Sequence, residues 1–174
     1  MPGTGSERER FDALYGSTYP EMAEYCRRRL PSSSWEDAVA EIYGVAWRKR
    51  DTYLSADNPA AWLQAVAFRV VSNEFRKRRR RRRLIEKLLR QDRPEVPPPE
   101  AFVEATNEER YALEALSTLK PIEQELVRLV AYEEHSYEEV AAITGLSASA
   151  VKTRLYRARQ TLTKVYLEKV EGQR

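Results

Sequence analysis

Residues 136–159 read SYEEVAAITGLSASAVKTRLYRAR, and this stretch decides the fold of the C-terminal half of the chain. Ser136 is followed three residues later by Glu139, which is the pattern of a capping box and predicts that a short helix begins here. Gly145 is expected to end that helix, because glycine readily takes the backbone conformation that closes a helix. Ser147 then stands where it can cap a second helix. The stretch therefore predicts two helices joined by a tight turn.

The spacing of three residues across this turn is that of a helix-turn-helix. Ala141, Gly145 and Val151 stand at relative positions zero, four and ten. A small alanine lets the helices approach, the glycine makes the turn, and the valine packs the second helix against the first. The spacing favours the DNA-binding motif, and the alternative is an ordinary helical hairpin with a basic exposed face.

The second helix is predicted to have one apolar and one basic side. Its apolar residues, from Val151 to Val165, recur at steps of four, three, four and three. The other side is polar and basic, which suits the major groove of DNA and its flanking phosphates. Those polar residues are Ser149, Lys152, Thr153, Arg154, Arg157 and Arg159.

The N-terminal half shows helical periodicity and no convincing strand pattern. Apolar residues between Phe11 and Tyr25 recur at steps of three and four, which predicts a first helix. The stretch 31–34, with sequence PSSS, breaks it. Ser34 is predicted to cap a second helix, about residues 35–50, with Asp37 at its third position.

A third helix is predicted to begin at Asn58-Pro59, after a loop over residues 49–58. This helix runs directly into residues 76–83, which read RKRRRRRR. Eight consecutive cations repel one another, so a partner with dense negative charge, such as nucleic acid, is the natural reason to keep them. The alternatives are a solvated charge run and a nuclear import signal.

The stretch 93–100 reads RPEVPPPE and predicts an extended, helix-free connector. Basic side chains outnumber acidic ones on the N-terminal side of this connector, where residues 1–83 carry 17 basic and 11 acidic side chains. Residues 84–115, which include the connector, carry 4 basic and 8 acidic side chains. We therefore expect an all-α fold in which an extended, proline-rich linker joins two small helical domains, the C-terminal one containing the helix-turn-helix. The expected boundaries are 1–90, 91–108 and 109–174.

Composition excludes several classes of protein. The 174 residues carry a formal net charge of +3, with one cysteine and one histidine. Cys26 and His135 cannot form an internal disulfide or a zinc site of the usual ligand count, and we expect no cofactor and no metal. Cys26 is expected to be a buried, inert thiol and His135 a surface turn residue. The sequence shows neither a membrane-spanning apolar stretch nor a signal peptide, so no membrane insertion and a cytoplasmic location are expected.

The motifs along the chain resemble those of the extracytoplasmic-function (ECF) sigma factors, the two-domain specificity subunits of bacterial RNA polymerase. Residues 37–48, DAVAEIYGVAWR, resemble the helix of the family's region two that docks on the polymerase. Residues 61–63, AWL, open a helix that ends in clustered arginines, as in the family. In region four, SYEEVA at 136–141 and GLS…VKTRLYRAR at 145–159 follow the family pattern.

The resemblance implies a non-enzymatic protein that binds core RNA polymerase and directs initiation at promoters with −35 and −10 elements. It also implies an anti-sigma factor as a regulatory partner. Core binding is expected of Asp37, Glu41, Trp47 and Arg48. Contacts with the −10 element, including capture of an unstacked base by the loop 49–58, are expected of Tyr53, Asn58, Trp62, Arg69, Asn73, Arg76, Lys77 and Arg78. Contacts with the −35 element are expected of Ser147, Ser149, Lys152, Thr153, Arg154, Arg157 and Arg159.

Two departures from the family pattern bear on promoter choice. A glutamine common in the docking helix is Ala40 here. The family's Asn-Leu-Leu-x-Asp-Arg stretch is replaced at residues 69–74 by RVVSNE, which exchanges an amide for a cation and a cation for an anion. Two alternatives therefore stay open: a sigma-like decoy that binds polymerase without reading promoters, and a stand-alone helix-turn-helix regulator.

Overall fold

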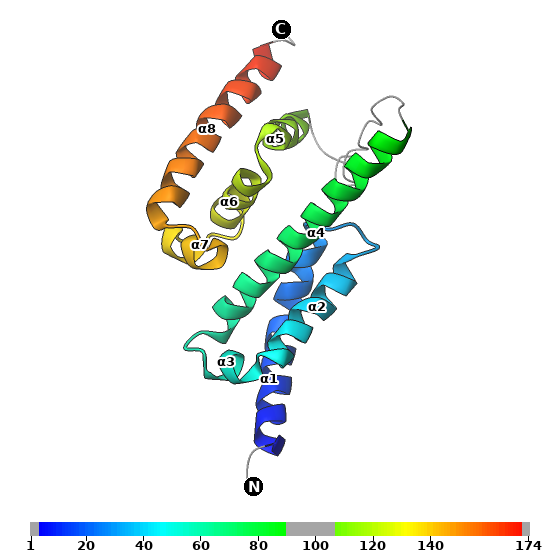
Figure 1. Cartoon of the computed structure of the whole chain (residues 1–174). Helices are drawn as coiled ribbons and strands as arrows, with labels where there is room; N and C mark the ends of the chain where they lie inside the picture. The colour runs from blue at the N-terminus through cyan, green and yellow to red at the C-terminus, as the bar shows by residue number, and fades with distance from the viewer. Residues whose placement is uncertain (1–3, 90–106, 172–174) are drawn as a thin grey trace. The chain divides into compact units, whose positions relative to one another are not determined.

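A computed structural model describes residues 4–89 and 107–171 of the chain, and the side chains of residues 7–84 and 110–168. These residues form eight α-helices and contain no strand (Figure 1), which confirms the predicted all-α fold. The chain divides into two compact units, residues 1–91 and 92–174. The proline-rich stretch 93–100, predicted to be extended, lies outside the described residues.

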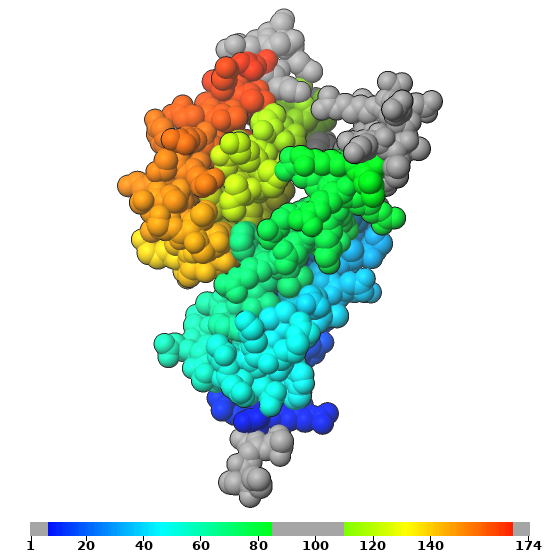
Figure 2. Space-filling model, in the orientation of Figure 1, coloured from blue at the N-terminus to red at the C-terminus, as the bar shows by residue number. Residues whose placement is uncertain are grey.

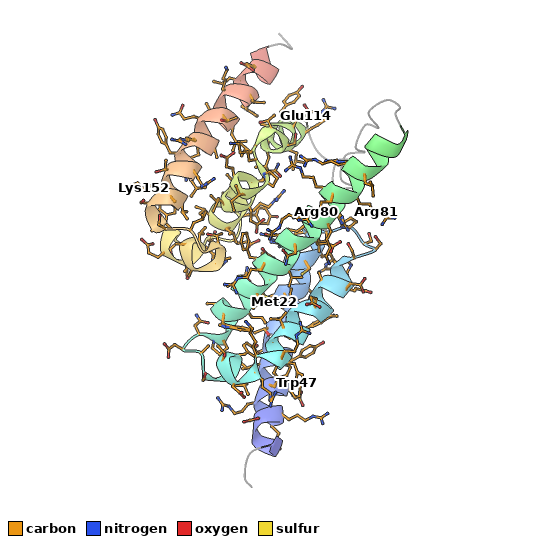
Figure 3. The ribbon with its side chains drawn as sticks, viewed as in Figure 1. Met22, Trp47, Arg80, Arg81, Glu114 and Lys152 are labelled. Carbon is orange, nitrogen blue, oxygen red and sulfur yellow. The ribbon has the colours of Figure 1, made fainter. Side chains whose placement is uncertain are left out.

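The N-terminal unit consists of α1 (Thr4–Arg27), α2 (Trp35–Arg48), α3 (Arg50–Ser55) and α4 (Pro59–Leu89). The long helix α4 packs against the other three, and α1 also packs against α2. Met22, labelled in Figure 3, is fully buried in this core. Most of the residues whose spacing predicted α1 and α2 are buried, whereas Leu14 and Trp35 are half-buried and Tyr15 is exposed. The buried ones are Phe11, Thr18, Met22, Tyr25, Val39, Ile42 and Ala46.

The start of α2 differs from the prediction that Ser34 caps it together with Asp37. Ser34 precedes α2 with φ −149° and ψ −5°, and its side chain makes no capping hydrogen bond. A capping side chain must face the first free N–H groups of its helix, usually from an extended backbone. The Ser34 hydroxyl instead donates to the Pro31 carbonyl at 3.3 Å and accepts a hydrogen bond from Arg78 of α4. The serine therefore ties α4 to the start of α2.

Part of the loop predicted for residues 49–58 is helical. The short helix α3 covers six of these residues, and its Tyr53 and Leu54 are buried. The Tyr53 ring packs edge-on against Phe11, with ring centroids 5.7 Å apart, and lies 5.3 Å from the ring of Trp62. Tyr53 and Leu54, which lie within the predicted loop, thus belong to the core of the unit.

The C-terminal unit consists of α5 (Asn107–Thr118), α6 (Pro121–Ala131), α7 (Tyr137–Thr144) and α8 (Ala148–Glu171). Pro121 opens α6, which suits proline because the first turn of a helix does not need its missing N–H. The long helix α8 packs against α5, α6 and α7 (Figure 1). The core of the unit comprises Tyr111, Ala115, Leu119, Leu126, Leu129, Val140, Ile143, Val151, Leu155 and Ala158.

Candidate nucleic-acid interface

The start of α7 has the predicted capping box. The Ser136 hydroxyl oxygen accepts from the Glu139 N–H at 3.2 Å, and the Glu139 carboxylate accepts from the Ser136 N–H at 2.8 Å. This backbone hydrogen bond, joined by one from the Ser136 hydroxyl, holds the pKa of the Glu139 carboxyl below its usual value. The exchange of hydrogen bonds fixes the residue at which α7 begins.

The turn between α7 and α8 is also confirmed. Gly145 ends α7 in the left-handed conformation, with φ 74°, and its N–H donates to the Ala141 carbonyl at 2.9 Å. Ser147 accepts from the Ala150 N–H at 3.2 Å and so caps α8. The left-handed residue reverses the chain within a few residues, and α8 leaves the turn packed against α7.

The two sides of α8 differ in burial. Val151, Leu155 and Ala158 are buried against the rest of the unit. Of the residues predicted to face DNA, Arg154 is half-buried and the others are exposed: Ser147, Ser149, Lys152, Thr153, Arg157 and Arg159. Lys152 stands near the start of the helix in Figure 3. The basic side of α8 is thus open to a partner in this unit.

A second polar face runs along α4 in the N-terminal unit. Trp62, Arg69 and Asn73 follow one another at steps of seven and four, so they share one side of the helix. Trp62 is half-buried, with its ring 5.3 Å from that of Tyr53, whereas Arg69 and Asn73 are exposed. Arg76 continues this side and donates to the Asn73 side-chain oxygen at 2.7 Å. An aromatic ring followed by an amide and cations suits single-stranded nucleic acid, whose bases stack and whose phosphates pair with arginine.

Three residues predicted to contact the −10 element are engaged within the unit. Tyr53 is fully buried, so its ring offers no surface to a base in this structure. Asn58 accepts from the Ala61 N–H at 3.0 Å and caps the start of α4. Arg78 donates to Ser34 and lies 3.7 Å from the Glu74 carboxylate. The cap made by Asn58 follows from the helix start predicted there, whereas sequence patterns gave no sign that Phe11 packs on Tyr53 or that Ser34 bonds Arg78, because these partners lie far apart in the chain.

A third surface lies on α2. Asp37, Glu41 and Arg48 are exposed, and Glu41 pairs with Arg48 at 3.1 Å. Trp47, which is labelled in Figure 3, is 46% exposed, although its ring packs nearly perpendicular to that of Phe11 at a centroid distance of 5.0 Å. The Arg50 guanidinium also lies over the Trp47 ring, 5.7 Å from its centroid. A partly exposed tryptophan held by such neighbours is the kind of anchor that protein interfaces use.

Known proteins and family models match this chain over most of its length. Residues 14–81 match the family described as Sigma-70 region 2, and residues 109–162 match Sigma-70, region 4. The ECF RNA polymerase sigma factor BldN of Streptomyces coelicolor is 27% identical over 162 residues, with 91% of this chain and 61% of BldN covered. The RNA polymerase sigma factor NccH of Alcaligenes xylosoxydans xylosoxydans is 30% identical over 141 residues, with 77% of this chain and 74% of NccH covered. The chain belongs to the ECF sigma factors.

A solved structure agrees with this assignment. The sigma factor RpoE of Bartonella quintana, crystallised with the anti-sigma factor NepR, superposes with a TM-score of 0.62 at 25% sequence identity. The alignment covers 89% of this chain and 95% of that one. The ECF sigma factor described here is a promoter-recognising transcription initiation factor, a class of protein that in general has no enzymatic activity. None of its described helices is long and apolar enough to cross a membrane.

Two outward residues of the sigma factor's α8 were missed by the sequence analysis. Tyr156 is 65% exposed, and Gln160 is also exposed. Both lie opposite the buried Val151 and Leu155, on the same side as Thr153. The helical periodicity that identified the apolar face could have found them, because the opposite face follows from the same spacing.

Proposed function

We propose that this sigma factor reads the −35 element with the outer side of α8 and the −10 element with the polar side of α4. The observation that carries the proposal is the helix-turn-helix of the C-terminal unit, in which α8 is buried on one side and basic on the other. A helix of this kind enters the major groove, where each base pair has a distinct pattern of donors and acceptors.

On the −35 side, we assign base reading and phosphate contact to different residues of α8. Arg157 and Arg154 have guanidinium groups that can bond two acceptors of a guanine at once, whereas Lys152 is suited to a phosphate. Thr153 and Ser149 lie on the exposed side between these cations and make secondary contacts with base edges. Ser147 caps the helix and brings it to the DNA, and Arg159 extends the basic surface along it.

On the −10 side, the polar face of α4 holds the melted strand. Trp62, Arg69 and Asn73 are the proposed contacts with the unstacked base and its neighbours, and Arg76 and Lys77 with the phosphates. Tyr53 supports the Trp62 ring from within the core. Asn58 and Arg78 position the start and the middle of α4, because each already bonds inside the unit. The substitutions at 69–74 are expected to alter the −10 sequence that is preferred.

Core polymerase is proposed to bind α2 through Asp37, Glu41, Trp47 and Arg48. The exposed part of the Trp47 side chain is the anchor, and the three charged residues form a polar line along one side of α2. An anti-sigma factor is the proposed regulator, because the similar Bartonella quintana protein was crystallised with one. The chain itself is proposed to act by binding alone, in the cytoplasm, with the polymerase making every bond.

The test is initiation in vitro. The purified chain is mixed with sigma-free bacterial core polymerase and a library of random promoters, and the DNA upstream of each transcript is sequenced. Enrichment of paired sequences near −35 and −10 supports the proposal. Core binding without transcripts would identify a decoy, and DNA binding without core binding would identify a stand-alone regulator; either result contradicts the proposal.

A further inference from the structure

The first turns of α1 hold the short helix α3 at two points. The Arg10 guanidinium donates to the Leu54 carbonyl at 2.8 Å, although the two residues are 44 positions apart in the chain. About one turn earlier in α1, the Glu7 carboxylate lies 3.7 Å from the Arg50 guanidinium, at the start of α3. In Figure 2 the first turns of α1, in blue, lie at the surface next to the cyan part of the unit that contains α3. One short stretch of α1 therefore contacts both ends of α3.

The bond from Arg10 reaches the last turn of α3. This helix runs from Arg50 to Ser55, and the carbonyl groups in the last turn of a helix have no amide partner within it. A cation at this end also interacts favourably with the negative end of the helix dipole. Because α3 has only six residues, it is too short to be stable by itself, and its position depends on contacts from outside.

The position of α3 determines the position of two features close to the proposed −10 contact. The Tyr53 ring of α3 lies 5.3 Å from the Trp62 ring of α4. Residues 56–58 join the two helices, and Asn58 caps α4 by accepting from the Ala61 N–H. This connection is held by α3 at one end and by the cap at the other. A shift of α3 would therefore move both the ring that packs against Trp62 and the chain that leads into α4.

We propose that Arg10 is a positioning residue for the reading of the −10 element, and that it makes no contact with DNA itself. Through the Leu54 carbonyl it fixes α3, and through α3 it holds the Trp62 ring where the unstacked base is received. This inference rests on the proposed contact between Trp62 and that base. A displacement of about 1 Å is enough to weaken a binding site whose groups must be placed accurately. The proposal gives α1 a part in promoter reading.

The exposure of Arg10 allows positioning to be separated from stability. Arg10 is exposed, whereas the neighbouring Phe11 is buried and packs against Tyr53 in the core. Substitutions at exposed positions change stability little, so Arg10→Gln should leave the urea midpoint of tryptophan fluorescence nearly unchanged. A change in base preference without a change in that midpoint would report a displaced site in a folded unit.

The test measures the affinity of holoenzyme for a promoter fragment selected from the random library, with the −10 element unpaired on its non-template strand. A series of fragments carries an abasic site at each −10 position in turn, and the position with the largest effect is the unstacked base. A base stacked on an aromatic side chain raises affinity by about tenfold, and wild-type holoenzyme should prefer the intact strand by about that factor. Arg10→Gln should lower this preference about fivefold and leave affinity for the abasic strand unchanged.

Three further variants control for charge, bonding and the route through Trp62. Arg8→Gln removes the same charge from the same helix, at a side chain that is 78% exposed and lies 4.0 Å from Asp12, and it should keep the wild-type preference. Arg10→Lys should restore most of the preference, because a lysine also donates to a carbonyl. Trp62→Ala should abolish the preference, and adding Arg10→Gln to it should cost little more, because both changes act through one ring. Circular dichroism checks the fold of each variant.

Salt dependence separates positioning from direct contact. If Arg10 bound a phosphate, Arg10→Gln would lower the slope of log K against log salt by about 0.7 to 0.9. An unchanged slope supports the proposal, and a fall of that size overturns it. An equal loss on the abasic strand, an equal effect of Arg8→Gln, or additive losses with Trp62→Ala would also overturn it.

The failure of this inference can be distinguished from that of the proposed function. If wild-type holoenzyme binds the intact and abasic strands equally at every position, the proposed −10 contact fails and this inference fails with it. A wild-type preference that survives unchanged in Arg10→Gln contradicts this inference alone.

Discussion

Replacing Gly145 by alanine should destabilise the C-terminal unit by about 1 kcal/mol. Gly145 has φ 74°, and a Cβ atom built on it would meet no atom within 4 Å. The cost is therefore conformational, with no steric clash added. A left-handed L-residue costs about 1 to 2 kcal/mol, and the lower entropy of the unfolded alanine chain returns about 0.4 to 1 kcal/mol. Gly145→Asn should cost less, because asparagine tolerates this conformation.

The chain contains an internal control for this measurement. Its three tryptophans, Trp35, Trp47 and Trp62, all lie in the N-terminal unit, residues 1–91. In a urea titration, tryptophan fluorescence therefore reports the unfolding of that unit, while far-UV circular dichroism reports the helices of both. Gly145→Ala should move the part of the dichroism transition that fluorescence does not share, and should leave the fluorescence midpoint in place.

Three results would refute this reasoning. An unchanged dichroism transition would mean that the left-handed turn carries no strain for alanine. A fluorescence midpoint that shifts as far as the dichroism would mean that the two units do not unfold separately. A larger loss for Gly145→Asn than for Gly145→Ala would mean that the conformation of the backbone is not the cause.

Three further predictions concern promoter reading, acid stability and the thiol. Arg157→Ala should cost about 1 to 3 kcal/mol of promoter affinity and relax the base preference at one −35 position. Lys152→Ala should instead weaken binding to all promoters alike and lower the slope of log K against log salt by about 1. Gel-shift titrations on single-base promoter variants measure both effects, and the same pattern for the two variants would contradict the assignment. The pKa of the Glu139 carboxyl is lowered in the folded protein, so its stabilising effect is present above its unfolded pKa of about 4.3 and is lost as the pH falls through the folded value. The urea midpoint of Glu139→Gln should therefore fall less than that of the wild-type protein between about pH 5 and about pH 3. Equal falls of the midpoint in the variant and the wild-type protein would contradict this prediction. Burial raises the pKa of the Cys26 thiol to about 11, so iodoacetamide at about pH 8 should react at a rate limited by unfolding; rapid alkylation without urea, followed by mass spectrometry, would show that the thiol is accessible.

The features predicted correctly from sequence are those that depend on near neighbours in the chain. Ser136 and Glu139 form their capping box within four residues, and Gly145 ends α7 through a bond to Ala141. In such cases the side-chain chemistry of a short segment determines its local structure. The same holds for the apolar face of α8, where spacing alone placed Val151, Leu155 and Ala158 in the core, although Leu162 and Val165 farther along are only half-buried.

The features that were missed depend on residues far away in the chain. The Ser34 hydroxyl, which was expected to cap α2, instead accepts a hydrogen bond from Arg78, 44 residues later, and donates one to the nearby Pro31 carbonyl. Tyr53 was assigned to DNA as part of the loop 49–58, but its ring is buried and packs against those of Phe11 and Trp62. A segment shows its own periodicity, whereas the partner that buries one of its side chains is set by the packing of the whole unit. The role of Arg78 depends in the same way on the packing of α4 against α2, which brings its guanidinium to Ser34.

The separation of the two sides of α8 leaves room for evolutionary change. Val151, Leu155 and Ala158 are buried in the core of the unit, while Thr153, Tyr156 and Gln160 are exposed on the opposite side. Substitutions on the outer side are therefore nearly free of a stability cost, because exposed positions away from caps and cores change the free energy of unfolding by about 0.5 kcal/mol or less. After a gene duplication, two copies could diverge in the promoters they recognise while each kept its fold. New regulons can arise in this way without passing through an unstable intermediate.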